Sequence, residues 1–342
     1  MPSGPNSWLR LRGPTRRWRH SSRADLAQHD IRRIRMKIAI AGTGRMGTAI
    51  TQRLLEVGHE VRVWNRTVDN AHEALAAGAI WAPTLGDLVD GSDVVISFLF
   101  DNAAVEHVYL DADGLLSGSA WGRLFIDMST VTPATHQRIA PAMASRNAVF
   151  IECPVSGSTA TARSGTLVGF AGGDAAAFAR AQPVLAQLCR RVEHVGPLGA
   201  GARMKLAANL LLTVFWQALG EALLLIDPSA MNVERTIDLL ADSNIAAGIL
   251  RMRAPQIVAS MKGSAAGAAA FNVDTMRKDL RYMADEAAAG GSSLPLADRT
   301  RECFDRASRE GAGGVDSVAY PAYWIARQKA GGASAKAMAP NR

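Results

Sequence analysis

Cysteine is scarce in this chain of 342 residues, which contains only Cys153, Cys189 and Cys303. Three scattered cysteines cannot build the disulfide framework of a small secreted protein, and they lack the paired spacing of a zinc site. We therefore expect no metal. A long uninterrupted hydrophobic run is also missing, because the longest apolar stretch, around residues 210–226, contains Gln217 and Glu221. This stretch predicts a buried helix rather than a membrane span.

A basic excess is absent from most of the chain, although the net charge is +7. Residues 1–35 contain nine Arg and only two acidic residues, which leaves 29 basic and 29 acidic residues in the remainder. Binding to nucleic acid usually requires a basic surface. We therefore expect neither a nucleic acid nor a membrane as partner.

The first 35 residues show no pattern of a hydrophobic core. An Arg-rich segment with few acids could direct the chain to an organelle. It could also be a disordered extension, with Met36 as the true start. We favour the second interpretation because Gly-Pro pairs at residues 4–5 and 13–14 interrupt an amphipathic helix. The segment has no continuous apolar region of the kind found in a signal peptide, so we expect a cytoplasmic protein.

A glycine-rich motif, Gly42-Thr43-Gly44-Arg45-Met46-Gly47, follows the apolar run at residues 37–41 and precedes a helical pattern. In this context Gly42 allows the tight turn after the strand, Gly44 lets the backbone approach a pyrophosphate, and Gly47 lets helix and strand pack closely. The N–H groups at the start of the helix face the phosphates. The motif predicts a nicotinamide dinucleotide cofactor, which all six residues would contact.

The end of the second predicted strand, residues 60–64, indicates which cofactor is used. Sites that prefer NAD usually carry Asp or Glu here, bonded to the ribose hydroxyls. This chain has Asn65-Arg66-Thr67 instead. Arg66 can pair with a 2′-phosphate through its guanidinium group, so we predict NADP(H) in preference to NAD(H). The alternative is that Arg66 is an ordinary solvated turn residue.

The order of predicted elements indicates two domains. Strands at residues 94–99, 124–127 and 149–152 alternate with helices at 133–144 and 175–188, which predicts an α/β Rossmann-type, doubly wound parallel sheet over residues 36–197. Residues 198–330 show only helical patterns, which we place from residue 202 for roughly 25 residues and at 230–242, 247–261, 275–289 and 295–310. A small-residue loop at 262–267 interrupts them. We predict that residues 331–342 form a disordered tail.

Polar residues gather at points where a ligand would lie in such a fold. Asp127-Met128-Ser129-Thr130 ends one strand and Cys153-Pro154-Val155-Ser156-Gly157-Ser158 ends the next. Hydroxyls and glycine-freed N–H groups of this kind suit a carboxylate. Lys205 and Asn209 share one face of the long apolar helix because they are four residues apart. Such groups are costly on an apolar helix unless they have partners or a function.

Together these motifs resemble the β-hydroxyacid dehydrogenase family, which includes 3-hydroxyisobutyrate dehydrogenase and the glyoxylate/succinic semialdehyde reductases. The resemblance covers residues 36–330. Four motifs match in order: the glycine motif, Asp127-Met128-Ser129-Thr130, Pro154-Val155-Ser156-Gly157, and Gly199-Ala200-Gly201 with Lys205. A fifth, Phe271 followed by Lys278-Asp279, matches a segment that faces cofactor and substrate in the family.

Several details are more similar to the reductase branch than to the hydroxyisobutyrate branch. They are Trp64-Asn65-Arg66-Thr67, Ser158, and the segment 201–206 with Asn209. The hydroxyisobutyrate branch has Asn at both positions corresponding to Ala208 and Asn209. Cys153 departs from the Ala or Gly that is usual before Pro-Val-Ser-Gly, and we interpret it as a small apolar core residue.

The resemblance implies a role for each site residue. Lys205 would be the catalytic acid/base, and Asn209 would orient Lys205 or the substrate. Ser129, Ser156 and Gly157 would hold a substrate carboxylate. Thr130 and Lys278 would contact the cofactor, while Phe271 and Asp279 would close over the site. Simpler readings exist for some of them: Ser129 and Thr130 as helix caps, Ser156-Gly157 as a turn, and Asp279 as a surface acid.

The resemblance also implies a function. We expect an NADPH-dependent reductase of a small aldehyde or keto acid, such as succinic semialdehyde or glyoxylate, that forms a homodimer or homotetramer. A 3-hydroxyisobutyrate-type dehydrogenase is an alternative. Imine reductases share the architecture but replace the lysine with residues such as Asp or Tyr, and non-catalytic NADPH-binding scaffolds have lost it. Lys205 therefore argues against both of these rivals.

Overall fold

The computed structural model describes residues 35–226, 232–243, 248–264, 269 and 271–337. Residues 36–342 belong to one compact unit. The extension predicted for residues 1–35 lies outside the described residues except for Arg35, and so do residues 338–342 of the predicted tail.

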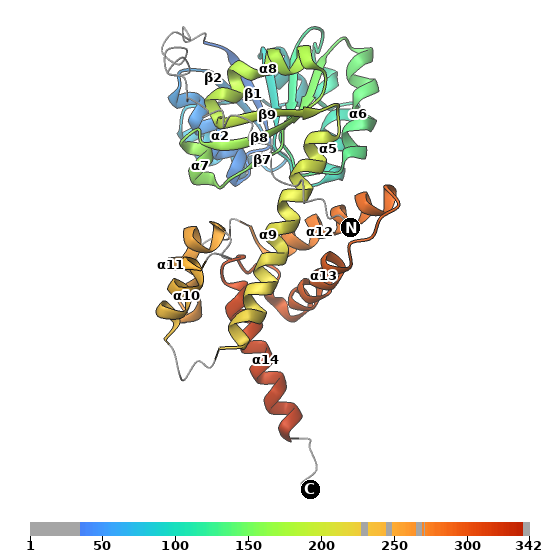
Figure 1. Ribbon diagram of the computed structural model, residues 1–342. Coiled ribbons are helices and arrows are strands. Elements are labelled where there is room, and N and C mark those ends of the chain that lie inside the picture. Colours follow the sequence, from blue (N-terminus) through green and yellow to red (C-terminus); the bar gives the residue numbers. More distant parts are fainter. Residues whose placement is uncertain (1–34, 227–231, 244–247, 265–268, 270, 338–342) are drawn as a thin grey trace, which may run out of the picture. The chain divides into compact units, whose positions relative to one another are not determined.

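Six parallel strands form the first part of a nine-stranded sheet (Figure 1). Their order is β3-β2-β1-β4-β5-β6. Successive strands are added on one side of β1 up to β3 and on its other side from β4 onward, as in a doubly wound fold. The register places Ile38 of β1 between Val61 of β2 and Val94 of β4. The strands are β1 (Lys37–Ala41), β2 (Glu60–Trp64), β3 (Ile80–Trp81), β4 (Val94–Ser97), β5 (Leu124–Asp127) and β6 (Val149–Glu152). The Rossmann-type prediction is confirmed.

The sheet continues in a way that the prediction of a parallel sheet missed. Strand β8 (Leu167–Gly172) is antiparallel to β6 and to β7 (Val155–Ser156), and β9 (Cys189–Gly196) is parallel to β8. Hydrophobic periodicity could not reveal these strands. Strand β7 has two residues, β8 contains Gly169, and most side chains of β9 face solvent.

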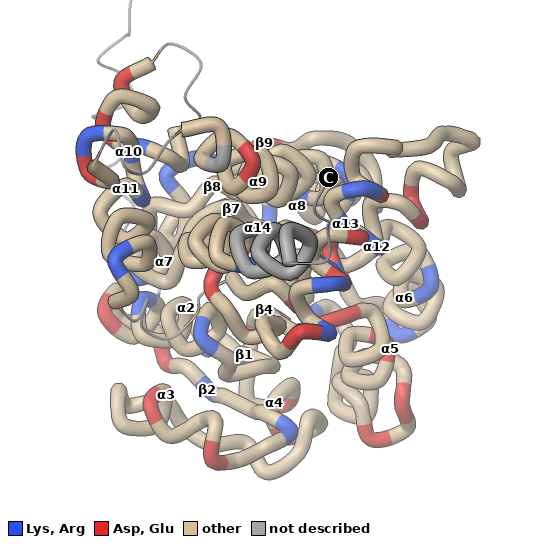
Figure 2. Tube along the Cα trace, turned by 90° about the horizontal axis from the view of Figure 1, so that it is seen from below, with Lys and Arg blue, Asp and Glu red and all other residues tan. Residues whose placement is uncertain are grey.

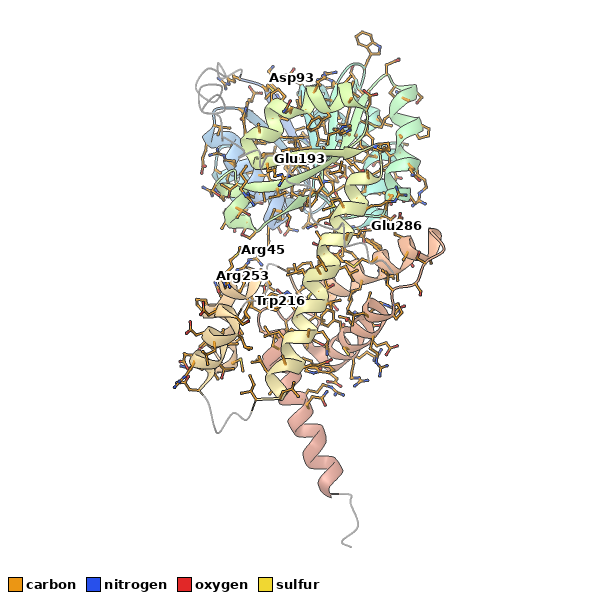
Figure 3. The ribbon with its side chains drawn as sticks, viewed as in Figure 1. Arg45, Asp93, Glu193, Trp216, Arg253 and Glu286 are labelled. Atoms are coloured by element: carbon orange, nitrogen blue, oxygen red, sulfur yellow. The ribbon has the colours of Figure 1, made fainter. Side chains whose placement is uncertain are left out.

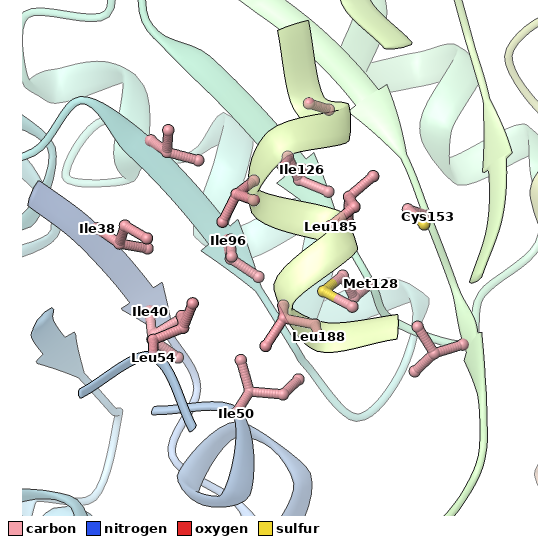
Figure 4. Close-up of a cluster of buried hydrophobic side chains, with 14 of the residues drawn as sticks. Ile38, Ile40, Ile50, Leu54, Ile96, Ile126, Met128, Cys153, Leu185 and Leu188 are labelled. Carbon is pink, nitrogen blue, oxygen red and sulfur yellow. The ribbon is translucent and has the colours of Figure 1, made fainter. Parts of the chain in front are cut away.

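Helices cover both faces of this sheet and enclose two separate cores. On one face, β1, β4 and β5 present side chains such as Ile96 and Ile126 to Leu185 and Leu188 of the helix α8 (Figure 4). On the other face, Phe125 packs with residues of α4, α5 and α6. The helices are α2 (Arg45–Glu56), α3 (His72–Ala76), α4 (Leu85–Asp90), α5 (Asn102–Leu110), α6 (Pro133–Ser145), α7 (Thr159–Arg163) and α8 (Ala175–Leu188), with short 3₁₀ turns at Val68–Ala71 and Leu115–Ser117.

The helices and strands named among the described residues after the sheet are all helices, as predicted, and one isolated β-bridge pairs Asn272 with Asp316. The helices are α9 (Ala200–Leu224), α10 (Val233–Asp242), α11 (Gly248–Met261), α12 (Val273–Ala289), α13 (Pro295–Ala307) and α14 (Tyr320–Ala337). They share a core that includes Trp216 of α9, Leu280 of α12 and Phe304 of α13; Figure 3 labels Trp216 midway along α9. The predicted helix at 295–310 is confirmed as α13 followed directly by a π-helical turn, Ser308–Ala312, in which Gly311 adopts φ 87°. One prediction was wrong, because residues 331–337 continue α14 instead of forming a tail.

Helix α9 is the main link between the sheet and the helices that follow. It is long and apolar enough to cross a membrane by length and composition. However, Leu206, Trp216 and Leu219 are buried in the helical core, so packing within the protein accounts for part of its apolar character, while Leu211 is exposed. Figure 2 shows acidic and basic residues interspersed over the helices in that view.

Candidate active site

The glycine loop between β1 and α2 is shaped by close backbone contacts. Gly42 adopts φ +102°, and a Cβ there would lie 2.4 Å from the carbonyl oxygen of Phe98. A Cβ on Gly47 would lie 1.9 Å from the carbonyl oxygen of Gly42. Gly44 is different, because among the described residues no heavy atom beyond its chain neighbours and its own helix backbone lies within 4 Å of the position of its Cβ. The backbone of the loop therefore packs closely against neighbouring backbone at Gly42 and Gly47, and open space lies beside Gly44.

The open space beside Gly44 fits the pyrophosphate of a dinucleotide. Gly44 is the N-cap of α2 and supplies no side-chain acceptor for the first N–H groups of the helix. The Oγ1 atom of Thr43 is buried and has no hydrogen-bond partner among the described residues. Unpaired donors at a helix N-terminus bind anions. The loop thus has the donors and the space that the phosphates require.

Some residues in and next to the loop are hydrogen-bonded within the protein, and others have no partner among the described residues. Asn65 accepts a hydrogen bond from the N–H of Thr43 (3.1 Å) and donates one to the carbonyl of Thr67 (2.8 Å). It therefore ties the loop to the end of β2. Arg66 is exposed and has no partner within the described part of the chain. Arg45 donates to the carbonyl of Ala269 (Figure 3).

Lys205 lies in the second turn of α9, half-buried. No acceptor among the described residues is paired with its ammonium group. Burial lowers the pKa of Lys205 from 10.5 to about 8, the nearby carboxylate of Asp279 opposes this change, and the positive charge of Lys278 adds to it. A lysine with this pKa exchanges a proton near neutral pH, which is what a general acid/base must do.

Asn209, one turn beyond Lys205, is held by an acid from α12. Its Nδ2 donates to Oδ2 of Asp279 (2.7 Å), and Oδ1 of Asp279 lies 3.1 Å from Nζ of Lys278. All three side chains are buried. Asp279 is therefore not the surface acid of the simpler reading, and it fixes the amide of Asn209 on the same helix face as Lys205.

Lys278, which was predicted to contact the cofactor, has partners within the protein that were not predicted. Its ammonium group donates to the carbonyls of Phe100 (2.8 Å) and Thr130 (3.2 Å). It also lies 5.2 Å from the ring centres of both Phe100 and Tyr282. The Tyr282 hydroxyl in turn accepts from the N–H of Asn102 (3.2 Å). These contacts join α12 to the ends of β4 and β5.

The hydroxyl of Ser129 forms hydrogen bonds within the protein. It donates to Oδ1 of Asp127 (2.7 Å) and accepts from the N–H of Leu99 (2.9 Å), and the residue has no exposed surface. The described structure therefore leaves no surface of Ser129 for contact with a substrate, and its predicted role in binding the carboxylate stays a prediction. Thr130 is half-buried, and its side-chain hydroxyl has no partner among the described residues.

Ser156 and Gly157 follow the bend after β6. Gly157 adopts φ +149°, and a Cβ there would lie 2.4 Å from Oγ1 of Thr161, so the position requires glycine. Ser158 caps α7, while Ser156 is half-buried. Phe271 is half-buried and packs against the helical core. In the described residues, no hydrogen bond joins Ser156, Gly157 or Phe271 to Lys205 or Asp279, so their grouping with Lys205 stays a prediction.

A buried polar network beneath the site was not predicted. His136 of α6 has its Nε2 2.7 Å from Asp127 and its Nδ1 2.5 Å from Glu152, and the three side chains have no exposed surface. The signal in the sequence was an acid at the end of each of two apolar strands, Asp127 and Glu152. Charges are rarely buried without partners, so each of these acids called for a partner that the sequence alone did not identify.

The fold and this cluster define a two-domain nicotinamide-dependent oxidoreductase. Residues 37–196 match the model of the NAD binding domain of 6-phosphogluconate dehydrogenase, and residues 199–324 match that of the NAD-binding domain of NADP-dependent 3-hydroxyisobutyrate dehydrogenase. The chain belongs to the β-hydroxyacid dehydrogenase family, whose members are NAD(P)-dependent enzymes that act on CH–OH groups.

Relatives with different substrates are similarly close. The chain is 34% identical to the NAD-dependent L-serine dehydrogenase of Pseudomonas aeruginosa, over 76% of this chain and 88% of that protein. It is 31% identical to glyoxylate/succinic semialdehyde reductase 1 of Arabidopsis thaliana, over 82% and 96%. The structure of Mycobacterium tuberculosis 3-hydroxyisobutyrate dehydrogenase with L-serine matches with a TM-score of 0.74 at 26% identity, covering 84% of this chain and 98% of that one.

Proposed function

We propose that the protein is an NADPH-dependent reductase of a small aldehyde or keto acid, of which succinic semialdehyde and glyoxylate are the leading candidates. The observation that carries this proposal is the half-buried Lys205, whose pKa of about 8 suits proton transfer near neutral pH. When bound, the cofactor supplies the hydride. Similarity to the Arabidopsis reductase supports the choice of substrate.

The protein's own groups would act on the carbonyl oxygen of the substrate. Negative charge develops on this oxygen during reduction, and a nearby ammonium group stabilises the charge and donates the proton. Lys205 would fill this role, with Asn209 fixed beside it by Asp279. In the reverse direction neutral Lys205 would accept the proton of the alcohol. The free hydroxyl of Ser156 and the backbone at Gly157 are our candidates for binding the carboxylate.

The preference for NADPH is proposed from Arg66. An exposed guanidinium at the end of β2, with no carboxylate in the segment Asn65-Arg66-Thr67, suits a 2′-phosphate. The test is kcat/KM with NADPH and with NADH at the same substrate concentration. Higher kcat/KM with NADH would contradict this assignment without affecting the role of Lys205.

The substrate is tested by initial rates with NADPH and succinic semialdehyde, glyoxylate, methylmalonate semialdehyde or a cyclic imine, and with NADP and 3-hydroxyisobutyrate or L-serine. Each rate is repeated with Lys205→Ala, which should lower turnover by roughly 100-fold or more because it removes a general acid. Lys37→Ala, at an exposed position of β1, is the matched control. Turnover of the hydroxy acids alone would favour the dehydrogenase alternative. Full activity of Lys205→Ala would refute the mechanism.

We also propose that the protein assembles as a homodimer or homotetramer, as its resemblance to the family implies. Light scattering of the purified protein at micromolar concentration tests this proposal. A monomeric mass would contradict it.

A further inference from the structure

The buried network around His136 connects two elements of the active site. Glu152 accepts hydrogen bonds from the N–H groups of Gly199 (2.6 Å), Gly201 (2.9 Å) and Ala202 (3.2 Å), which form the start of α9. Lys205 follows Gly201 by one helical turn. One carboxylate at the end of β6 therefore holds the start of the helix that carries Lys205.

Asp127 holds the other element of the site. Besides His136, it accepts from the hydroxyl of Ser97 (2.5 Å) and from that of Ser129 (2.7 Å). Ser129 precedes Thr130, whose carbonyl binds Lys278. Asp127 thus organises the residues after β5, on the opposite side of the network from α9.

His136 is the group that joins these two carboxylates. Ionised carboxylates only accept hydrogen bonds, so the 2.7 Å hydrogen bond to Asp127 places a proton on Nε2. Nδ1 lies 2.5 Å from Glu152 without regular hydrogen-bond geometry, and a proton on Nδ1 makes this contact an ion pair. Charge balance supports the same state: one imidazolium between two carboxylates leaves a net charge of −1, beside the positive end of the α9 dipole.

The backbone around Glu152 leaves little room for α9 to shift. A Cβ on Gly172 would lie 2.2 Å from Oε1 of Glu152, and a Cβ on Gly201 would lie 2.3 Å from the carbonyl oxygen of Phe170. Helix and sheet therefore approach as closely as glycine allows. The position of the helix start therefore depends on the position of Glu152, which His136 helps to hold.

We propose that His136 is a positioning residue which, as an imidazolium between Asp127 and Glu152, fixes the start of α9 against the ends of β5 and β6 and so sets the position of Lys205. This inference rests on the proposed function of Lys205 as acid/base. His136 itself has no exposed surface and touches neither substrate nor cofactor.

The first test compares His136→Asn with His59→Asn. His59 is also buried in the Rossmann part and hydrogen-bonded, to Gln187 and to the N–H of Met36, but it has no link to α9. We expect His136→Asn to slow single-turnover hydride transfer roughly 10- to 100-fold, because small errors of position have effects of this size. The Kd for NADPH, measured by fluorescence, should stay within about twofold. His59→Asn should change neither quantity, and equal losses in both variants would overturn the proposal.

The second test needs no turnover and therefore separates this proposal from the proposed function. The pKa of Lys205 is read by NMR of ¹³C-labelled lysine in the NADPH complex, with Lys205→Ala to assign the signal. A loosened helix start admits water to the ammonium group, so His136→Asn should move this pKa upward from about 8 toward 10.5. An unchanged pKa in the folded variant would overturn the proposal even if no substrate is found.

A third measurement addresses the protonation state. The ¹⁵N shifts of His136 should report two protonated ring nitrogens at pH 7.5 in the wild type. In Glu152→Gln, the amide can donate to Nδ1, so His136 should become neutral while the start of α9 stays partly capped. A neutral His136 in the wild type would overturn the imidazolium bridge.

Discussion

At the scale of the single residue, the lowered pKa of Lys205 predicts that reduction and oxidation depend on pH in opposite directions. The group must be protonated to donate a proton to the carbonyl oxygen and neutral to accept one from the alcohol. Reduction should therefore slow as the pH rises through about 8, and oxidation should accelerate over the same interval. Profiles of kcat/KM from pH 6 to 10, measured in both directions, check this. Parallel profiles in the two directions would exclude Lys205 as the shared acid/base.

Two glycines of the cofactor loop provide a matched pair of substitutions. Gly44→Ala puts a methyl group into space that is empty in the protein, at φ −64°, so stability should barely change while NADPH binding weakens. Gly47→Ala puts it 1.9 Å from the carbonyl of Gly42, so the protein should lose stability by several kcal/mol. Urea denaturation and NADPH titration of both variants separate the two effects. Tight NADPH binding by folded Gly44→Ala would contradict the proposed place of the pyrophosphate.

At the scale of the element, His136 should link the stability of the α6–β5–β6 region to pH. Burial by itself lowers its pKa, but the hydrogen bonds and charges of Asp127 and Glu152 outweigh burial and raise the pKa from 6.5 to about 9. The stabilisation is fully present below pH 6.5 and is lost as the pH rises through about 9. A shift of this size corresponds to roughly 3 kcal/mol.

The measurement is the free energy of unfolding in urea between pH 6 and 10, for the wild type and His136→Asn. The difference between the two proteins should shrink as the pH rises, because only the wild type has this proton to lose. A difference that is constant with pH would mean that His136 contributes packing alone. Lys205 also titrates in this range, and its pKa should differ between the two proteins, so both are measured in the Lys205→Ala background, where this contribution is absent.

The sequence predicts some elements of the fold and not others. The apolar run before Gly42 is a local pattern, and it predicted the Rossmann core correctly. The shared helical face of Lys205 and Asn209 is also a local pattern, and the roles of the glycine loop in cofactor binding and of Lys205 as acid/base stay predictions. Strand β9 is hidden because solvent-facing residues such as Arg190 and Glu193 follow no apolar alternation. The carbonyls that bind Lys278 and the two acids that contact His136 lie on other elements, and no local pattern identifies these partners.

At the scale of the whole molecule, Lys278 joins the sheet to the helices and also influences the acid/base. It binds carbonyls at the ends of β4 and β5, pairs with Asp279, and its positive charge contributes to the low pKa of Lys205. Its side chain is almost completely buried. One side chain thus couples the contact between the two parts of the protein to the protonation of the site.

Replacement of Lys278 by Met keeps the apolar stem and removes the charge. Breaking a buried pair and leaving Asp279 without its counter-charge should cost about 3–5 kcal/mol of stability. It should also raise the pKa of Lys205 above 8, since a repelling cation is gone and the carboxylate of Asp279 is left for Lys205 to face. The midpoint of the pH profile for reduction should then move upward. Tyr282→Phe is the control, because it removes only the acceptor of the Asn102 N–H and leaves every charge in place. A midpoint that moves equally in both variants would show that the joint between sheet and helices, rather than the charge of Lys278, sets the pKa of Lys205.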